Sequence, residues 1–536
     1  MKKKLIFYGV VIVTGILAGG FAAISWGGEL ERSFMSFRRI RDVQEISQIR
    51  LGMPRDGTEL KVNFSRFPDG EIYVRIADPQ RIQGESITVL APFKSEDDFM
   101  KMFLTLGALK QYGAKNISLV IDGWHPQTPE DERFISVLKL FSDDISVWDA
   151  TTVGIKRLNI SAPPTFSKIT EPIHIDRVAY IQPRFKQDVE EAVGRIKDAK
   201  SSFIDVKQAS EGYWTVNNPS DLAGKNVVLI HSTETSRNIL ELLLALSSLR
   251  DAAVNSVSLI NTYQGYARQE RENKEGEGVS AHMILSALNR FLDRNFSINV
   301  HYAKGSDMDI SLAPEIWVTE NGNKKIINRL QEEKVYNLNG FVQLGEKLME
   351  IVKNGTADGK LQGVGEEEFK KHPILLLAPD DGAFRYAQEA AKAIKEYKEK
   401  YGEKIDIIAG YLDKERVGSS KVKFVGPVLG EAGQELKIKL DDYWTFILDD
   451  ETSTGGTVKG ATYHIVQNLG ADKKKIYSGV VHGKFATGLE EFYITKDEEM
   501  LPQIIIALDT LPLPSSITSA SSAPLISYAI KRILGK

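Results

Sequence analysis

The 536-residue sequence contains no cysteine, and this absence removes several classes of protein. Without thiols there can be no disulfide, no metal or iron–sulfur site built on thiolates, and no cysteine nucleophile. An excess of one charge is also lacking, since 68 lysines and arginines face 72 aspartates and glutamates for a formal net charge of −4. No overall basic field is available to attract nucleic acid, so any anion must be bound by a local cluster.

One segment lacks charge altogether. After Lys2–Lys4, residues Leu5–Trp26 carry no charged side chain, and about 20 such residues can cross a bilayer as a helix. We expect residues 1–27 to be a retained membrane anchor or, alternatively, a cleaved signal segment, because small residues at Ala18–Ala23 offer cleavage sites. Arginines within Arg32–Arg41 nearly balance the lysines before the segment, so the positive-inside rule leaves its orientation open.

The remainder alternates short apolar runs with longer amphipathic stretches. Ile87–Ala91, Val227–Ile230 and Phe446–Leu448 are runs of the buried-strand type, and Phe99–Tyr112 and Asn238–Arg250 have helical periodicity. Strand, helix and strand at this spacing predict an α/β protein with parallel sheets and crossover helices. Such sheets bind ligands in loops at the carboxyl ends of their strands.

The chain also repeats itself. A shift of 140 residues aligns Pro79 with Pro219 and Gly84 with Gly224 without a gap, and apolar positions match around them. Two copies of one α/β domain are therefore expected, followed by a third α/β unit. The expected organisation is a first domain at 43–150, a connector at 151–187, a second domain at 188–310, a connector or insertion at 311–365 and a C-terminal domain at 366–536.

The strongest chemical signal lies in Phe446–Thr457. A hydrophobic strand leads into the carboxylates Asp449 and Asp450, then into a Thr-Gly-Gly-Thr turn, and a helix is expected from near Val458. Glycine amides, hydroxyl donors and a helix N-terminus together favour the binding of a phosphate monoester. The two carboxylates suit sugar hydroxyls beside that phosphate, or a hydrated Mg²⁺.

Asp449–Thr457 resembles the ribose-phosphate loop of the phosphoribosyltransferase fold. Phe67–Glu71, Gly265–Arg271 and Lys414–Arg416 resemble segments of ribose-phosphate pyrophosphokinases and stand in that family's order. The resemblance implies tandem phosphoribosyltransferase-like, Rossmann-like domains that transfer the β,γ-diphosphoryl group of MgATP to the anomeric hydroxyl of ribose 5-phosphate and release AMP. Two alternatives are a non-catalytic, membrane-tethered relative that binds nucleotide or ribose phosphate, and an ordinary phosphoribosyltransferase.

For the nucleotide, the resemblance implies that Phe67 stacks on adenine while Asp69 and Glu71 accept hydrogen bonds from its amino group. It also implies that Arg268 and Gln269 contact nucleotide and phosphate oxygens.

For the transfer step, it implies that Lys414 and Arg416 are the basic pair that neutralises charge as AMP departs. The expected ligands of ribose 5-phosphate are the carboxylates, hydroxyls and glycines of one loop: Asp449, Asp450, Thr454, Gly455, Gly456 and Thr457.

For the metal, the resemblance implies Mg²⁺ near His301 and Asp380. Two neighbours depart from the family's pattern, because Asn299 stands where an aspartate is usual and Ala383 where many relatives have glycine.

The two copies differ in which motif they keep. The first copy has Phe67–Glu71, and the second has Arg268 and Gln269. In the family the adenine loop comes from a neighbouring subunit, so we expect an internal pseudo-dimer, with a homo-oligomer as the alternative. Because the implied substrate is ATP, the domains are expected to face the cytoplasm.

Overall fold

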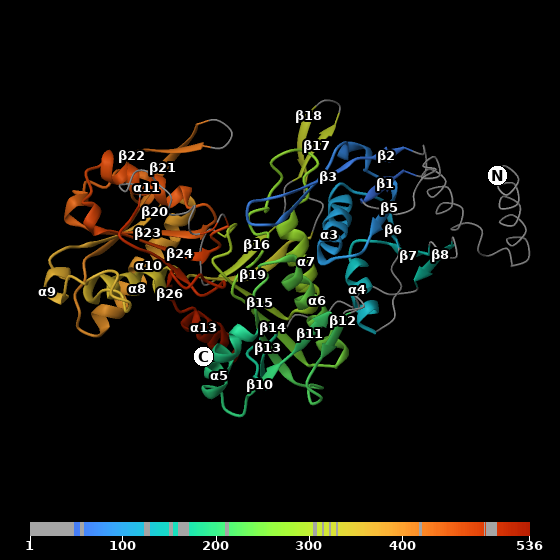
Figure 1. Cartoon of the computed structure of the whole chain (residues 1–536), viewed down its shortest axis with the longest axis horizontal. Coiled ribbons are helices and arrows are strands. Elements are labelled where there is room, and N and C mark those ends of the chain that lie inside the picture. Colours follow the sequence, from blue (N-terminus) through green and yellow to red (C-terminus); the bar gives the residue numbers. More distant parts are fainter. Residues whose placement is uncertain are drawn as a thin grey trace, which may run out of the picture.

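The structure is a computed structural model that describes residues 48–53, 58–122, 129–149, 154–158, 171–208, 214–303, 308–312, 316–320, 323–327, 331–417, 421–486, 488 and 501–536. It is an α/β protein with three large sheets, each in its own unit. We name these the first unit (residues 48–158), the second unit (171–338) and the third unit (341–536). Figure 1 shows the second unit between the blue first unit and the orange-to-red third unit.

The first unit has a six-stranded sheet in the order β2-β1-β5-β6-β7-β8, in which β5, β6 and β7 run parallel. A separate hairpin, β3–β4, extends from it. The elements are β1 (Arg50–Gly52), β2 (Glu59–Leu60), β3 (Val62–Arg66), β4 (Ile72–Ile76), β5 (Ser86–Pro92), α3 (Glu96–Gln111), β6 (Asn116–Asp122), α4 (Pro129–Leu138), β7 (Asp144–Asp149) and β8 (Gly154–Leu158).

The second unit has a seven-stranded sheet in the order β10-β9-β13-β14-β15-β19-β16, parallel except for β16. Its sheet elements are β9 (Arg177–Tyr180), α5 (Lys186–Gly194), β10 (Lys200–Phe203), β13 (Asn226–His231), α6 (Ser236–Asp251), β14 (Ser256–Asn261), α7 (Ser280–Phe291), β15 (Arg294–Ile298), β16 (Met308–Leu312) and β19 (Glu333–Leu338). Two hairpins accompany it, formed by β11 (Asp205–Gln208) with β12 (Trp214–Asn217) and by β17 (Ile316–Glu320) with β18 (Asn323–Ile327).

The third unit has a seven-stranded sheet in the order β22-β21-β20-β23-β24-β25-β26, parallel from β21 to β26. Its elements are α8 (Phe341–Asn354), α9 (Glu366–Phe369), β20 (Ile374–Ala378), α10 (Asp381–Lys400), β21 (Ile407–Val417), β22 (Lys421–Leu429), β23 (Trp444–Thr452), α11 (Gly456–Gln467), β24 (Ile476–Gly483), β25 (Ile505–Leu508), β26 (Thr518–Ala520) and α13 (Ala523–Leu534).

The two stretches expected to be connectors also contain parts of the units. Residues 311–365 supply β19 to the second sheet and the amphipathic helix α8, whose buried face packs in the core of the third unit. Residues 151–187 supply β8 and β9 to the first and second sheets. Glycine and charge in residues 354–371 favour a linker, whereas the buried face of α8 just before them packs in a core.

The expected membrane segment, residues 1–27, lies outside the described residues. Within the part of the chain that the structure describes, no helix has the length and apolar character needed to cross a bilayer.

Local hydrogen bonds recur at the 140-residue shift seen in the sequence. Gly84 N donates to Gly113 O at 2.9 Å, and Gly224 N donates to the O of Ala253, the residue equivalent to Gly113, at the same distance. The N-terminal caps correspond as well: Asp98 N donates to Ser95 Oγ at 3.2 Å and Asn238 N to Thr235 Oγ1 at 3.1 Å. The first and second units therefore share equivalent turn hydrogen bonds and helix N-caps.

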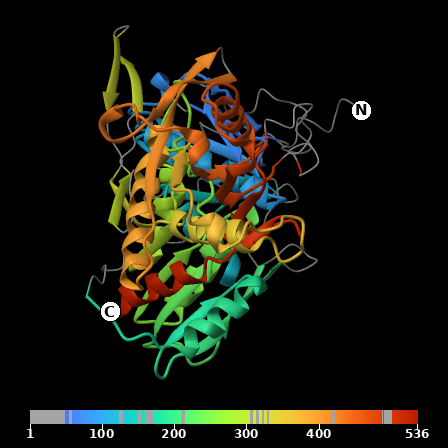
Figure 2. The same ribbon diagram turned by 90° about the vertical axis from the view of Figure 1, so that its left-hand side faces the viewer.

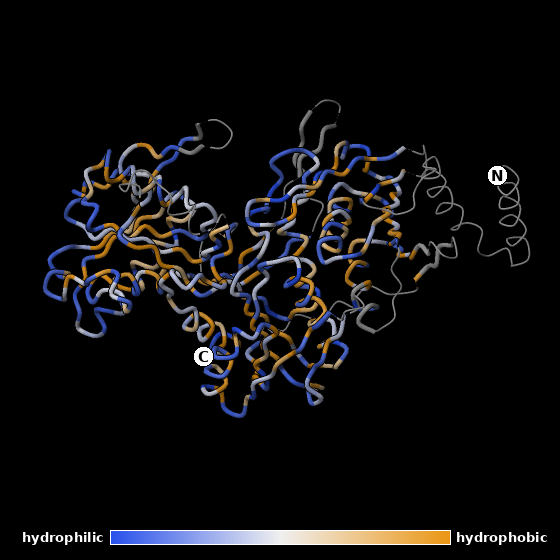
Figure 3. The backbone as a smooth tube through the Cα atoms, viewed as in Figure 1, coloured by the Kyte–Doolittle hydropathy of each residue, from blue (hydrophilic) through white to orange (hydrophobic). Residues whose placement is uncertain are grey.

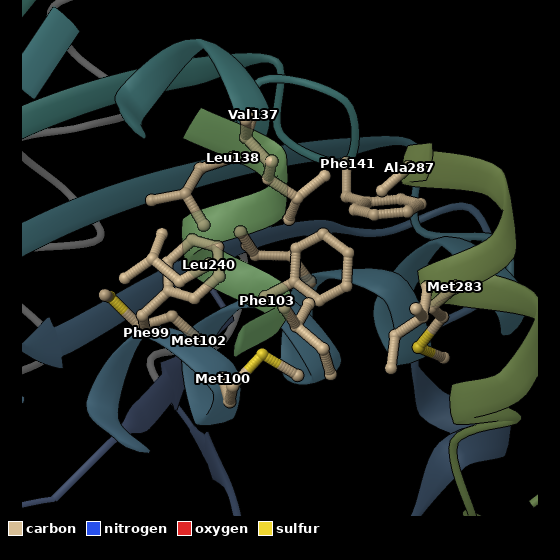
Figure 4. Close-up of a cluster of buried hydrophobic side chains, with 14 of the residues drawn as sticks. Phe99, Met100, Met102, Phe103, Val137, Leu138, Phe141, Leu240, Met283 and Ala287 are labelled. Atoms are coloured by element: carbon tan, nitrogen blue, oxygen red, sulfur yellow. The ribbon is translucent and has the colours of Figure 1, made fainter. Parts of the chain in front are cut away.

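A single hydrophobic core joins the first two units. Figure 4 shows Phe103 of α3, Leu240 of α6 and Met283 of α7 in one buried cluster. The backbone of α3 approaches α7 closely at Gly107, where an added Cβ would lie 2.5 Å from Met283 Sδ. The packing of these helices fixes the first unit relative to the second.

The sheet of the second unit is buried on both faces. Along β13, Val227 and Leu229 belong to the core shared with the first unit, whereas Val228 and Ile230 belong to the core shared with the third unit. This is the alternation that a strand requires. Figure 3 shows the hydrophobic residues concentrated along such inner strands, and Figure 2 shows α13 lying beside α5, where Arg195 Nη1 donates to Ser527 Oγ at 2.9 Å.

Candidate active site

The β3–β4 hairpin of the first unit reaches the second unit. Its tip turns at Gly70, which has φ +88°, and Phe67 N donates to Glu71 O at 3.0 Å. Past the tip, Gly278 N donates to Val74 O at 3.1 Å and Tyr73 Oη donates to Glu277 Oε1 at 2.5 Å. The hairpin is therefore held by backbone and side-chain bonds to residues more than 200 positions away.

The buried carboxylate of Glu71 fastens the hairpin tip to the second unit. Its side chain is 5% exposed, Oε1 accepts from Tyr266 N at 2.7 Å, and Oε2 accepts from Gln269 Nε2 at 3.2 Å. The receiving turn is tightly constrained, because Tyr266 has φ +63° and a Cβ on Gly265 would lie 2.1 Å from Thr233 O. The structure thus brings together two segments that the sequence assigns to the nucleotide.

Phe67 and Asp69 flank the same tip. Phe67 is 37% exposed, and its ring meets Tyr73 edge to face with centroids 5.7 Å apart, so a ring face is available for stacking. Asp69 Oδ1 accepts from Glu71 N at 3.2 Å. A cavity of about 350 Å³ opens here, lined in part by Asp69, Glu71 and Tyr266.

Arg268 links the hairpin region to the third unit. Arg268 Nη1 lies 3.6 Å from Glu451 Oε1, and Tyr263 Oη donates to Glu451 Oε2 at 3.2 Å. Burial opposes the charge of Arg268, but Glu451 and Asp450 outweigh it and raise the arginine's pKa. Arg268 therefore stays cationic at the junction between the second and third units.

The expected ribose-phosphate loop lies at the carboxyl end of β23. The strand continues through Asp449 and Asp450 to Thr452, and Gly455, with φ +75°, directly precedes α11. The helix begins at Gly456, two residues earlier than expected, and no side chain caps its N-terminus. Its first amides, together with the hydroxyls of Thr454 and Thr457, form an arrangement suited to an anion.

The carboxylates of this loop differ in charge. Burial raises the pKa of Asp449 well above its usual range, and repulsion from Asp450 and Asp380 adds to the effect. Asp450 is buried as well, yet His301 holds its pKa below the usual range through a 2.6 Å contact between Nδ1 and Oδ2. Asp450 is therefore the ionised member of the pair and Asp449 the group that binds a proton most readily.

The contact with Asp450 favours the protonated form of His301. Burial lowers its pKa, but the charge and hydrogen bond of Asp450 outweigh burial and raise it. A protonated imidazole has no lone pair for a metal and can donate to a phosphate oxygen. Asn299, two residues earlier, has a structural role, since it adopts φ +39° and its Oδ1 accepts from Gly340 N at 2.6 Å.

Lys414 and Asp380 lie at the other side of the loop. Lys414 extends from β21 and forms an ion pair with Asp380, whose Oδ1 accepts from Ala383 N at 3.1 Å and caps α10. Ala383 lies in the first turn of α10 with a negative φ, so this position does not require glycine. The side chain of Arg416 lies outside the described residues.

The carboxylates of Asp450 and Asp380 both act on the buried carboxyl group of Asp449. Burial is the main cause of the raised pKa of Asp449, and the charges of Asp450 and Asp380 add to it, so a nearby divalent cation would favour the ionised form. Among the described residues, no preformed group of three or more metal-ligating side chains occurs. The protein's own carboxylates thus fit Mg²⁺ that arrives with phosphate oxygens as its other ligands.

Lys484 is a site residue that the sequence analysis did not single out. It follows β24, and its Nζ lies 2.8 Å from Asp69 Oδ2. A lone lysine after an apolar strand carries no motif, so only the three-dimensional structure reveals this contact. His482, two residues earlier, is architectural, since burial lowers its pKa to about 4 and its Nε2 lies 3.0 Å from Ile298 O.

The fold defines a class: an α/β protein with polar loops at the carboxyl ends of parallel strands, where such folds bind their ligands. A family model described as the N-terminal domain of ribose phosphate pyrophosphokinase matches residues 45–125 and again residues 180–291. These two stretches of the chain are therefore similar to the N-terminal domain of ribose phosphate pyrophosphokinases.

Individual relatives are distant but well covered. The chain is 24% identical over 293 residues to a ribose-phosphate pyrophosphokinase of Thermoplasma acidophilum, matching 54% of this chain and 79% of the relative. It is 25% identical over 348 residues to that of Sulfurisphaera tokodaii, matching 64% of this chain and 96% of the relative. The phosphoribosylpyrophosphate synthetase structure from Mycobacterium smegmatis aligns at 17% identity with a TM-score of 0.44, over 67% of this chain and 99% of that one.

Proposed function

We propose that the protein is a ribose-phosphate diphosphokinase that converts ATP and ribose 5-phosphate into phosphoribosyl pyrophosphate and AMP for nucleotide biosynthesis. One observation carries the proposal. The segments assigned to the nucleotide meet through Glu71 and Gln269 at 3.2 Å, and they adjoin the sugar-phosphate loop through Arg268 and Glu451 at 3.6 Å.

In the reaction, the anomeric oxygen of ribose 5-phosphate attacks the β-phosphorus of ATP. The bond between that phosphorus and the oxygen bridging to the α-phosphorus breaks, AMP leaves with the bridging oxygen, and the anomeric proton is released. Lys414 and Arg416 would neutralise the charge that develops on the leaving AMP. Lys414 forms an ion pair with Asp380, whose charge in turn acts on Asp449 of the loop.

The two substrates would take separate parts of the site. Adenine would stack on Phe67, with its amino group directed to Asp69 and Glu71, beside the cavity at the hairpin tip. The 5-phosphate of the sugar would bind the first amides of α11 with Thr454 and Thr457, and Asp450 would accept from the sugar hydroxyls.

Mg²⁺ bound with ATP would supply positive charge next to the β-phosphate. Asp380 and Asp449 are the carboxylates that would hold it, because their mutual repulsion falls when a cation enters. His301, predicted near the metal, would contact a phosphate as an imidazolium instead.

We further propose that the first and second units are tandem phosphoribosyltransferase-like copies that pack as an internal pseudo-dimer. The hairpin of one copy then completes the site of the other within a single chain, as the bond between Glu71 and Tyr266 N supports. The specific activity should therefore stay constant on dilution. A fall in activity as the chain dissociates would show that a homo-oligomer completes the site.

We propose that residues 1–27 anchor the enzyme in a membrane with its domains in the cytoplasm, where ATP is available. The uncharged run Leu5–Trp26 is the supporting observation. Membrane fractionation with alkaline extraction, followed by protease protection, tests the anchor and its orientation.

The central experiment incubates the purified full chain with MgATP and ribose 5-phosphate and measures AMP and phosphoribosyl pyrophosphate. Equimolar formation of both products is the expected result. Binding of both substrates without AMP release would favour a non-catalytic relative, and release of pyrophosphate from phosphoribosyl pyrophosphate with a base would favour a phosphoribosyltransferase.

A further inference from the structure

Lys484 carries a buried positive charge at the point where all three units meet. Its side chain is 8% exposed, and its Nζ lies 2.8 Å from Asp69 Oδ2, 3.2 Å from Glu71 Oε1 and 3.7 Å from Glu451 Oε1. The ammonium also lies 4.8 Å from the centre of the Tyr263 ring. One cation thus contacts the hairpin of the first unit, the strand-end turn of the second unit and the sugar-phosphate loop of the third.

The backbone of the same residue is fixed to that loop. Lys484 N donates to Thr452 O at 3.0 Å, and Ala486 N donates to Ser453 O at 3.0 Å. Between them Phe485 is buried in the core around α11 and β24. Movement of residues 452–453 must therefore move Lys484.

The charges around Lys484 require a cation. Asp69, Glu71 and Glu451 have side chains that are 7%, 5% and 4% exposed, so water solvates them poorly. Burial lowers the pKa of Lys484, but Glu451, Glu71 and Asp69 outweigh it and raise the pKa. Arg268 lies 3.6 Å from Glu451, and in the described part of the chain the ion pairs of Asp69 and Glu71 are made with Lys484.

We propose that Lys484 is a positioning residue that couples the two substrate sites, because it ties the nucleotide hairpin to the ribose-phosphate loop. This inference rests on the proposed function for the identity of the two ligands. Sugar phosphate that orders the loop at Thr452 and Ser453 would also order Lys484, and through it Asp69 and Glu71. ATP would then bind more tightly in the presence of ribose 5-phosphate, and the reciprocal effect must be equal.

The test compares Lys484→Met, which keeps the length of the side chain without charge, with Lys484→Arg, which keeps the charge. Lys474→Met, an exposed lysine of the same unit, is the matched control. Calorimetry measures ATP affinity with and without ribose 5-phosphate, steady-state kinetics separates KM from kcat, and hydrogen exchange follows the peptide over residues 67–73.

For Lys484→Met we expect ATP affinity to fall by about tenfold or more and the ribose 5-phosphate effect on it to vanish, since buried charged partners are worth this much. KM for ATP should rise far more than kcat falls, and residues 67–73 should exchange faster. Lys484→Arg should restore part of the coupling, and the Lys474→Met control should match the wild type.

Two results would overturn the proposal. One is a folded Lys484→Met protein with wild-type coupling and wild-type exchange in the hairpin. The other is an Arg variant that is no better coupled than the Met variant. Failure of the proposed function looks different: the wild type itself would release no AMP, while the exchange comparison would still report whether Lys484 holds the hairpin.

Discussion

Glu71 offers the sharpest test of how the hairpin is held. Its carboxylate accepts three hydrogen bonds, from Tyr266 N at 2.7 Å, from Gln269 Nε2 at 3.2 Å and from Lys484 Nζ at 3.2 Å. Glu71→Ala removes both acceptor oxygens and with them all three hydrogen bonds, which leaves the Tyr266 amide, the Gln269 amide and the Lys484 ammonium short of a partner. Each charge-assisted bond is worth about 1.5–3 kcal/mol, part of which water recovers, so about 3 kcal/mol of local stability should be lost.

Glu71→Gln should cost less, about 1–2 kcal/mol, because its carbonyl oxygen can still accept from Tyr266 N and Lys484 although the charge is gone. The matched control is Glu59→Ala, in which the lost ion pair with Arg50 is at the surface and contributes little.

Native-state hydrogen exchange measures these differences directly, because the amides of Ile72 and Tyr266 are both bonded at the hairpin contact. A loss of about 3 kcal/mol corresponds to exchange faster by roughly 150-fold at these amides. Wild-type exchange in Glu71→Ala, or equal damage by Glu71→Gln and Glu71→Ala, would show that the Glu71 carboxylate does not hold the hairpin.

Further predictions concern the chemistry and the turn that supports it. Lys414→Ala should lower kcat, measured by AMP release, by about 10³-fold and leave ATP affinity, measured by calorimetry, little changed. Lys423→Ala, on the strand paired with that of Lys414, is the control and should be near wild type in both assays. Because the pKa of His301 is raised on folding, its ion pair is present below the ordinary histidine pKa and is lost as pH rises through the raised value. Affinity for ATP, whose phosphate His301 is proposed to contact, should therefore fall across that window in calorimetric titrations, and His301→Gln should remove the dependence. Gly265→Ala should raise KM for ATP and lower the melting temperature, because its Cβ would meet Thr233 O at 2.1 Å, while Gly194→Ala, with open space around it, should do neither.

Much of the architecture can be predicted from the sequence because buried faces of strands and helices require apolar residues at regular spacing. The β13 run Val227–Ile230 and helix α6 lie where apolar periodicity predicts them, and the motif around Asp449 has the strand-loop-helix context that predicts a phosphate ligand. The α/β fold and the similarity to ribose-phosphate pyrophosphokinases follow from such local signals. Roles of individual site residues remain predictions that the experiments above address.

Other features depend on contacts between distant segments and leave no local trace. Lys484 forms ion pairs with Glu71 of the first unit and Glu451 of the third only in the folded chain, and neither the spacing nor the periodicity of the sequence predicts these pairs. The same holds for Asn299. It departs from the family's aspartate, yet its conformation and its bond to Gly340 N show that this position caps the entry to α8.

The position of the second unit explains why one chain can bring these groups together. Its sheet faces the first unit through Leu229 and the third unit through Ile230, so each strand end is held from both sides by closely packed side chains. The turn that carries Arg268 follows β14 at the carboxyl end of this sheet, where both hydrophobic cores pack against it. It can contact the hairpin on one side and the sugar-phosphate loop on the other only while both cores are intact. A cavity made in either core, by Leu229→Ala or by Ile230→Ala, should therefore loosen contacts on its own side of Arg268 and spare the opposite side. That asymmetry would distinguish a site assembled between units from one contained within the third unit alone.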